Sequence, residues 1–198
     1  MSEQEKVDKT RRNLVVATSA VGAAAGVAAA IPFAVSMMPS ERAKAAGAPV
    51  ELDVANMAPG EMAVVEWRGK PVWVIRRTRE MLESLKAVTP RLVDPDSKSS
   101  EQPAYARNPM RSEKPEWMVM EGVCTHLGCS PQLRSAEAKA EMGADWVGGF
   151  YCPCHGSKFD YAGRVFRGAP APTNLKVPPY TLTEARLVIG EDKDNKGA

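Results

Sequence analysis

Two short boxes, Cys124-Thr125-His126-Leu127-Gly128-Cys129 and Cys152-Pro153-Cys154-His155-Gly156-Ser157, contain every cysteine and histidine of the 198-residue chain. Each box offers one thiolate and one imidazole, at C-x-H spacing in the first and C-x-x-H in the second, together with a further cysteine. Gly128 and Gly156 allow tight turns that bring several backbone N–H groups toward one centre. The boxes therefore predict one metal site and a fold that brings the two loops together.

Two thiolates and two imidazoles suit two kinds of metal site. One is a structural zinc site, and the other is a Rieske 2Fe-2S cluster, in which two thiolates hold one iron and two imidazoles the other. Zinc sites usually pair Cys with Cys and His with His, whereas each box here is mixed. The spacing favours the cluster, and the zinc alternative predicts a colourless protein without a redox role.

The boxes resemble those of the Rieske iron–sulfur subunits of ubiquinol:cytochrome c oxidoreductase, the respiratory cytochrome bc complex. The resemblance extends to the apolar N-terminal segment, the linker after it, and the stretch from Phe159 to Pro178, which includes Gly163-Arg164-Val165-Phe166 and Ala169-Pro170-Ala171-Pro172. It implies a mainly β Rieske fold, with an antiparallel β-sandwich base and a small cluster-binding subdomain, preceded by one transmembrane helix. The implied cofactor is one Rieske-type 2Fe-2S cluster.

The resemblance also implies roles for the residues of the boxes, with the two thiolates on the inner iron and the two imidazoles on the outer iron. The implied ligands are Cys124, His126, Cys152 and His155, and the implied disulfide joins Cys129 to Cys154. Ser157 matches the family serine whose hydroxyl bonds a bridging sulfide. Leu127 is either a shield over the cluster or a buried packing residue.

Phe159 is a departure from the family pattern. Many high-potential members carry tyrosine at this position, where its hydroxyl bonds a ligand sulfur. Because that donor is missing, we expect a lower midpoint potential than in tyrosine-bearing relatives, and Tyr161 has the wrong spacing to replace it. Two further departures are Ala169, where the family usually has glycine, and the long insert at residues 130–151, which we expect to be peripheral.

The implied function is respiratory electron transport, as a subunit of quinol–cytochrome c reductase, a multi-subunit enzyme of the translocase class. The chain would accept an electron from ubiquinol at the outer quinone site of the cytochrome b subunit, with His155, or else His126, at the exposed tip taking the proton. It would pass the electron to a c-type cytochrome subunit and so contribute to proton translocation, in a complex expected to be dimeric. The alternative is the Rieske subunit of another periplasmic oxidoreductase, such as arsenite oxidase.

Composition argues against nucleic-acid binding, and the residues of the boxes disfavour aromatic-ring dioxygenase components. The 26 basic and 24 acidic side chains are scattered and give a formal net charge of +2, so no basic block indicates nucleic-acid binding. Aromatic-ring dioxygenase components lack the extra cysteine pair. They also need a second iron site, which cannot be built when both histidines of the chain lie in the boxes.

An apolar segment precedes the boxes, and no ionisable side chain occurs from residue 13 to residue 40. The 22 residues from Leu14 to Val35 would extend roughly 33 Å as a helix, against about 30 Å of hydrocarbon in a bilayer. We predict a transmembrane helix over residues 14–38. Arg11-Arg12 indicates a twin-arginine export signal, so a cleaved signal peptide is the alternative; the apolar run exceeds the usual length of about 7 to 15 residues, which favours a retained anchor.

Charge around this segment predicts its orientation. Lys6, Lys9, Arg11 and Arg12 precede it, whereas Arg42 and Lys44 follow it. The positive-inside bias therefore places residues 1–13 in the cytoplasm. In a bacterium the chain would cross the inner (cell) membrane once, with a flexible tether at residues 39–50 and a periplasmic Rieske domain at residues 51–198.

Short apolar and β-branched runs predict antiparallel strands within residues 51–198. The expected strands are Met62–Glu66 and Pro71–Ile75, which form a hairpin, and Trp117–Val123, Gly163–Phe166, Leu175–Val177, Tyr180–Thr183 and Arg186–Ile189. One helix is expected from Arg79 to Val88, capped by Thr78. Residues 92–115 are rich in Pro, Ser, Asp and Asn and predict a long surface loop.

Overall fold

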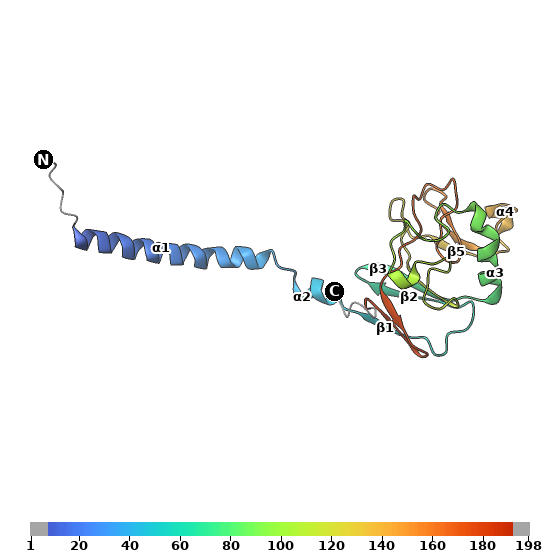
Figure 1. The fold of residues 1–198 in the computed structure, drawn as a ribbon, viewed down its shortest axis with the longest axis horizontal. Coiled ribbons are helices and arrows are strands. Elements are labelled where there is room, and N and C mark those ends of the chain that lie inside the picture. Colours follow the sequence, from blue (N-terminus) through green and yellow to red (C-terminus); the bar gives the residue numbers. More distant parts are fainter. Residues whose placement is uncertain (1–7, 192–198) are drawn as a thin grey trace. The chain divides into compact units, whose positions relative to one another are not determined.

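A computed structural model describes residues 8–191, and the chain divides into two compact units, Met1–Ala45 and Ala46–Ala198 (Figure 1). Lys6, one of the four cations that predict the orientation, lies outside the described residues, as do the other residues of the segment 1–7. The boundary between the two units falls inside the predicted tether at residues 39–50.

The first unit consists largely of one long helix, α1 (Lys9–Ser36), of 28 residues. Asp8 caps it, since the carboxylate accepts hydrogen bonds from the backbone N–H groups of Thr10 and Arg11. None of its residues is buried, it is strongly apolar, and its length of roughly 42 Å suffices to cross a membrane. A short helix, α2 (Glu41–Ala46), follows within the alanine-rich tether.

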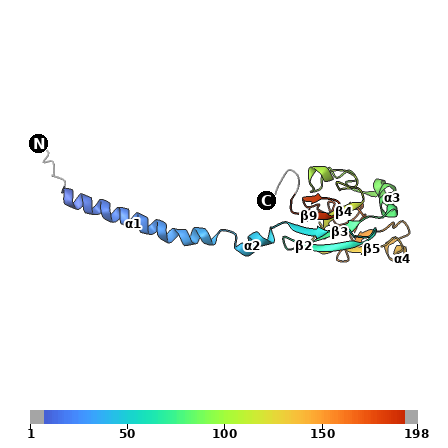
Figure 2. The same ribbon diagram turned by 90° about the horizontal axis from the view of Figure 1, so that it is seen from below.

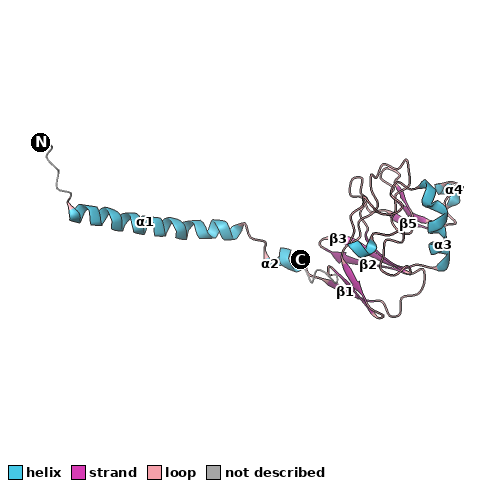
Figure 3. Ribbon diagram, in the orientation of Figure 1, coloured by secondary structure: helices cyan, strands magenta, loops and turns pink. Residues whose placement is uncertain are grey.

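The second unit contains three antiparallel sheets of three strands each (Figure 3). The base sheet comprises β1 (Val50–Asp53), β9 (Arg186–Ile189) and β8 (Tyr180–Leu182). The middle sheet comprises β2 (Met62–Trp67), β3 (Lys70–Arg76) and β4 (Trp117–Glu121), and the tip sheet comprises β5 (Gln132–Arg134), β6 (Gly149–Tyr151) and β7 (Lys158–Phe159). The mainly antiparallel β class expected from the sequence is confirmed.

The predicted hairpin and helix are present. Strands β2 and β3 join through a two-residue turn in which Arg68 and Gly69 both have positive φ, the conformation that matches the twist of a hairpin. Helix α3 (Arg79–Val88) begins after Thr78, whose hydroxyl accepts a hydrogen bond from the backbone of Met81 at 3.2 Å. It lies on the side of the domain that also carries α4 (Lys139–Met142), away from β1 (Figure 1), and Figure 2 shows α3 and α4 at the same end of the domain.

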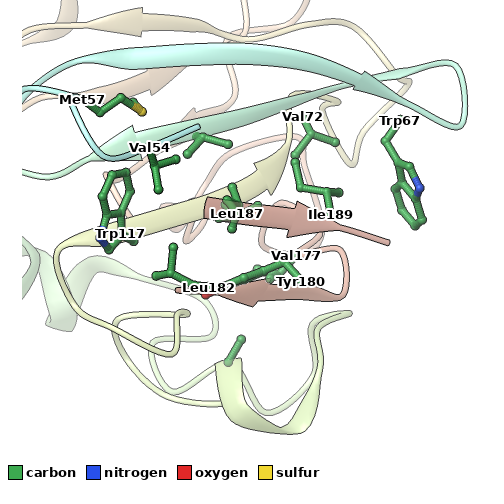
Figure 4. Close-up of a cluster of buried hydrophobic side chains, with 13 residues drawn as sticks. Val54, Met57, Trp67, Val72, Trp117, Val177, Tyr180, Leu182, Leu187 and Ile189 are labelled. Carbon is green, nitrogen blue, oxygen red and sulfur yellow. The ribbon is translucent and has the colours of Figure 1, made fainter. Parts of the chain in front are cut away.

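The middle sheet is buried on both faces, because β3 and β4 alternate between two hydrophobic clusters. Val72 and Val74 of β3 pack with residues of the base sheet such as Leu187 and Ile189, and Figure 4 shows Val72, Leu187 and Ile189 in this cluster, with Trp67 and Trp117 at its two ends. Trp73 and Ile75 of β3, together with Met118 and Met120 of β4, join the second cluster, which contains Cys124 and Cys152. The middle sheet thus connects the apolar base to the site carrying the boxes.

Two predicted strands are absent, and this part of the prediction was wrong. Gly163–Phe166 forms only isolated bridges, and Leu175–Val177 forms no strand. In Leu175–Val177, the N–H groups of Leu175 and Val177 donate to the separate carbonyls of Gly163 and Glu101, so no continuous strand pairing forms. In Gly163–Phe166, two backbone donors bond to side chains instead of to a neighbouring strand. The N–H of Arg164 donates to Asp160 Oδ1 and that of Val165 donates to Asn174 Oδ1, each at 2.9 Å. Trp117–Val123 is also shorter than expected and ends at Glu121.

The segment at residues 92–115 is an irregular loop, as predicted, but it does not lie wholly at the surface. Its Leu92 and Arg111 are fully buried, and it contains a short 3₁₀ helix at Ala104–Ala106. The guanidinium of Arg111 donates to the carbonyl of Ala162 at 3.2 Å, and burial lowers its pKa to about 10. The polar residues that suggested solvent exposure therefore bond to other buried groups.

The insert at residues 130–151 was expected to be peripheral, but it is part of the domain core. It supplies β5, α4 and β6. Trp146 within it is buried, and its indole N–H donates to the carbonyl of Ser135 at 3.0 Å. The insert consequently packs against the rest of the domain through a cluster that includes Val88, Leu92 and Phe166.

Candidate metal centre

The two boxes are closed loops of matching geometry. In the first, which follows β4, the N–H of Cys124 donates to the carbonyl of Cys129 at 2.7 Å, and the N–H of Gly128 donates back to Cys124 at 3.0 Å. In the second, between β6 and β7, the N–H of Cys152 donates to the carbonyl of Ser157 at 2.8 Å, and the N–H of Gly156 donates to the carbonyl of Cys152 at 2.9 Å. Gly128 and Gly156 have φ values of 83° and 79°, which glycine adopts without strain.

A disulfide between Cys129 and Cys154 joins the two loops, as the resemblance implied. The Sγ atom of Cys152 and the two disulfide sulfurs all lie within 4.8 Å of one another. A sulfur committed to a disulfide is not a thiolate, so of these three only Cys152 remains able to bind a metal. The disulfide therefore lies beside the ligand loops and holds them together.

The structure brings the four expected ligand residues together. Cys124 and Cys152 are free cysteines, each only 2% exposed. The imidazole rings of His126 and His155 lie with centroids 4.7 Å apart, nearly perpendicular, and His155 is the more exposed of the two. The thiols thus lie on the buried side of the site, and the imidazoles lie toward the solvent.

The chemistry of these donors fits an iron–sulfur cluster. Burial raises the pKa of the Cys124 thiol, and the neighbouring Cys152 raises it further, against opposing hydrogen bonds from the His126 backbone and Ser157. Two such thiolates in an apolar site need a cation to be stable. The Nδ1 atom of His126 is buried without a hydrogen-bond partner, so it is available as a metal ligand.

Ser157 lies where the resemblance requires a donor near the thiol sulfurs. Its side chain is fully buried, hydrogen-bonds Cys124, and accepts the backbone N–H of Ala171 at 3.1 Å. Sequence reasoning missed Thr125, whose hydroxyl donates to the carbonyl of Thr173 at 2.7 Å and so ties the first box to the proline-rich segment. Its place between the two ligand residues of the box was the available signal.

The remaining candidates differ in exposure. Leu127 is 70% exposed, which excludes the reading of a buried packing residue. Phe159 is fully buried among the hydrophobic side chains that surround both free cysteines, and its ring offers no hydrogen-bond donor there. Tyr161 packs in a different cluster with Leu85 and Ala162, so it does not take the place of the missing tyrosine.

Comparison with protein families identifies two segments. Residues 104–179 match the family model described as Rieske [2Fe-2S] domain, and residues 1–40 match the model described as Ubiquitinol-cytochrome C reductase Fe-S subunit TAT signal. The first match covers both boxes. Together with the two thiols and two imidazoles described above, it favours a Rieske 2Fe-2S cluster over a structural zinc site. The cofactor of this domain is a Rieske-type 2Fe-2S cluster.

Related proteins match along nearly the whole chain. The chain is 53% identical over 194 residues to the ubiquinol-cytochrome c reductase iron-sulfur subunit of Allochromatium vinosum, covering 98% of this chain and 94% of that protein. It is 42% identical to the subunit of the same name from Blastochloris viridis, covering 96% and 98%. A solved structure titled Hyperthermophilic respiratory Complex III matches with a TM-score of 0.49 and 28% identity, covering 87% of this chain and 98% of that one. By its identity to these relatives over almost its full length, the chain belongs to the family of ubiquinol-cytochrome c reductase iron-sulfur subunits.

Proposed function

We propose that this chain is the electron-transferring subunit of a membrane-bound quinol–cytochrome c reductase. The observation that carries the proposal is the pairing of two buried free thiols with two solvent-facing imidazoles in matched loops joined by a disulfide. The names of the relatives from Allochromatium vinosum and Blastochloris viridis support it. They do not favour the alternative of an arsenite oxidase subunit.

The ligands in this proposal are Cys124 and Cys152 for one iron and His126 and His155 for the other. Once bound, such a cluster supplies one-electron transfer at a higher potential than all-cysteine clusters, because imidazole is neutral where thiolate is anionic. Ser157 donates a hydrogen bond to sulfur from the buried side, which favours the more negative, reduced form.

The solvent-facing residues of the boxes would contact the quinol. His155 is exposed, so its imidazole can accept a hydrogen bond from a quinol hydroxyl and take up the proton as the electron is transferred. Leu127 presents an exposed apolar side chain from the other box, which suits contact with an apolar quinone site. These contacts would form at the outer quinone site of a cytochrome b subunit.

The partners would be the cytochrome b subunit, which binds the ubiquinol, and a c-type cytochrome that receives the electron, in a dimeric complex. Helix α1 would remain as a single-pass anchor in a bacterial inner membrane, with its N-terminus in the cytoplasm and the Rieske domain in the periplasm. The export-signal match over residues 1–40 and the length of α1 support this arrangement.

Purification from membranes in mild detergent tests the proposal. We expect b- and c-type haems to co-purify with the chain, and the reduced preparation to give a Rieske EPR spectrum. Co-purification with molybdenum instead of haem would reverse the choice in favour of the alternative. A colourless preparation containing stoichiometric zinc would contradict both.

The tether offers a second test, because electron delivery to two partners would require the domain to move. Ala43→Pro with Ala45→Pro breaks α2 and fixes φ at two positions, so the segment between α1 and β1 can no longer change its length by forming helix, and we expect slower steady-state turnover with an unchanged EPR spectrum. The matched control is Ala43→Gly with Ala45→Gly, which loosens the same positions. Turnover that is unaffected by the prolines would rule out domain motion on this tether.

A further inference from the structure

A pocket of about 500 Å³ lies between the insert and two neighbouring loops, apart from the metal centre. The insert contributes the segment from Met142 to Trp146, and β7 contributes Lys158. The loops contribute Arg91 and Arg167. The lining therefore contains three cations, whereas its one carboxylate is that of Asp145.

The three cations are held in place by carbonyl groups. Arg91 donates to the carbonyl of Asp145 at 2.9 Å, Arg167 to that of Leu92 at 2.9 Å, and Lys158 to that of Met142 at 2.5 Å. Among residues 8–191, none of the ion pairs involves any of the three. Each arginine therefore uses one guanidinium nitrogen to fix its position and keeps the others for a ligand.

Aromatic rings form the buried wall behind these cations. The guanidinium of Arg91 lies 5.3 Å from the ring centroid of Phe166, and the ammonium of Lys158 lies 5.9 Å from that of Trp146. Phe166 and Trp146 are 7% and 3% exposed, so the cations lie against an apolar surface. Charges beside such a surface act on a ligand more strongly than charges fully surrounded by water.

We propose that this pocket binds a phosphate group. A phosphate dianion balances the excess of cations over Asp145, and its tetrahedral oxygens accept the paired donors of two guanidinium groups together with an ammonium. The group could belong to free phosphate or a soluble phosphomonoester, or to the phosphodiester of a lipid headgroup, since each presents anionic non-bridging oxygens, although the phosphodiester carries one negative charge instead of two. This inference is independent of the proposed electron-transfer function.

Calorimetric titration of the full-length protein in an uncharged detergent, with inorganic phosphate at constant ionic strength, tests the proposal. We expect saturable binding that Arg167→Gln weakens at least about tenfold, as for the loss of a charge-assisted hydrogen bond. Arg167→Lys should recover part of the affinity, and Arg91→Gln should weaken it similarly. The matched control is Arg186→Gln, which removes an exposed cation that pairs with Glu51 far from the pocket, and its affinity should equal that of the unaltered protein.

Two further titrants identify the source of the phosphate. Glycerophosphoglycerol that binds as tightly as inorganic phosphate supports the pocket as a site for a lipid headgroup. Binding of inorganic phosphate and glycerol 3-phosphate alone supports a soluble ligand. The proposal is overturned if phosphate shows no saturable binding, or if it binds Arg167→Gln and Arg91→Gln as tightly as the unaltered protein while their EPR spectra confirm intact domains.

Discussion

The base and the tip of the Rieske domain are stabilised by different interactions. The base consists of apolar side chains from the base and middle sheets, among them Val72, Leu187 and Ile189, packed face to face (Figure 4). The tip consists of strands of two or three residues and two loops closed by backbone hydrogen bonds and one disulfide. Burial of apolar surface stabilises the base and also the side chains beneath the cysteines, and covalent and polar bonds are added at the tip, where they allow the imidazoles to stay at the surface.

The middle sheet makes this division possible, because consecutive residues of β3 serve different regions. Val72 and Val74 contact the base, while Trp73 and Ile75 support the cysteines of the tip. A substitution in the base should consequently change the stability of the domain and leave the iron–sulfur cluster unaltered. A substitution in the tip should change the cluster first.

The largest effect is expected from Cys152→Ser at the tip. Loss of a thiolate ligand should abolish cluster binding, because serine is a poor ligand for iron in such clusters. Iron content and the EPR signal of the purified full-length protein should fall to background, while far-UV circular dichroism shows that the base sheets remain. Ser130→Ala, which alters an exposed residue next to the first box, is the control and should keep full iron content.

The double substitution Cys129→Ala with Cys154→Ala tests whether the disulfide, unlike the ligands, is dispensable for iron binding. A loss of iron equal to that of Cys152→Ser would contradict this distinction. We expect that pair to retain iron when freshly prepared but to lose about 3 kcal/mol of stability, from the loop-closure entropy of a bond across a separation of 25 residues. In guanidinium titrations, the visible circular dichroism of the cluster should be lost before tryptophan fluorescence changes. Coincident transitions at the original midpoint would contradict the separate stabilisation of the tip.

Leu187→Ala tests the base with an effect of comparable size. Leu187 is fully buried on β9, and its truncation should lower the free energy of unfolding by about 3 kcal/mol through lost burial and a cavity. Val64→Ala, at a position that is 56% exposed on β2, should cost less than about 0.5 kcal/mol. Guanidinium unfolding gives both values. Altered EPR g values in Leu187→Ala would show that the base also shapes the cluster.

Sequence reasoning identified the tip more completely than the parts that support it. Metal chemistry demands particular residue types at fixed spacing, so the two boxes and their glycines could be recognised locally. The hairpin turn at Arg68 and Gly69 and the Thr78 cap of α3 were also readable, because each depends on a few adjacent residues. These features need no knowledge of distant contacts.

The segments that were misread depend on contacts between residues far apart in the chain. Arg164 donates to the carbonyl of Leu85, 79 residues away, and forms a fully buried ion pair with Asp160 at 2.7 Å. The side-chain amide of Asn174 similarly donates a hydrogen bond to the carbonyl of Asp94 and accepts one from the N–H of Val165. The local pattern predicted a strand at Gly163–Phe166 and an exposed loop at residues 92–115, and only the folded chain shows that the side chains of Asp160 and Asn174 take the place of a neighbouring strand inside the domain.

The smallest effect is expected from Phe159→Tyr, which tests whether the midpoint potential of the iron–sulfur cluster can be changed without disturbing the base. Phe159 is buried beside both free cysteines, so an added hydroxyl that bonds a ligand sulfur would stabilise the reduced cluster. A hydrogen bond of about 1 kcal/mol in favour of the reduced form corresponds to a rise of roughly 40 mV in midpoint potential. Protein-film voltammetry measures this rise.

Phe150→Tyr is the matched control, because Phe150 lies directly opposite Phe159 in the β6–β7 pair and belongs to the same buried cluster. Its ring stacks on Trp73 with centroids 4.8 Å apart, so an added hydroxyl there introduces the same polarity on the side of the middle sheet. We expect Phe150→Tyr to lower stability without raising the potential. Equal potentials in both variants and the unaltered protein would mean that Phe159 does not cause a low potential, and the hydrogen bond from Ser157 would then remain as the donor that tunes the cluster from the buried side.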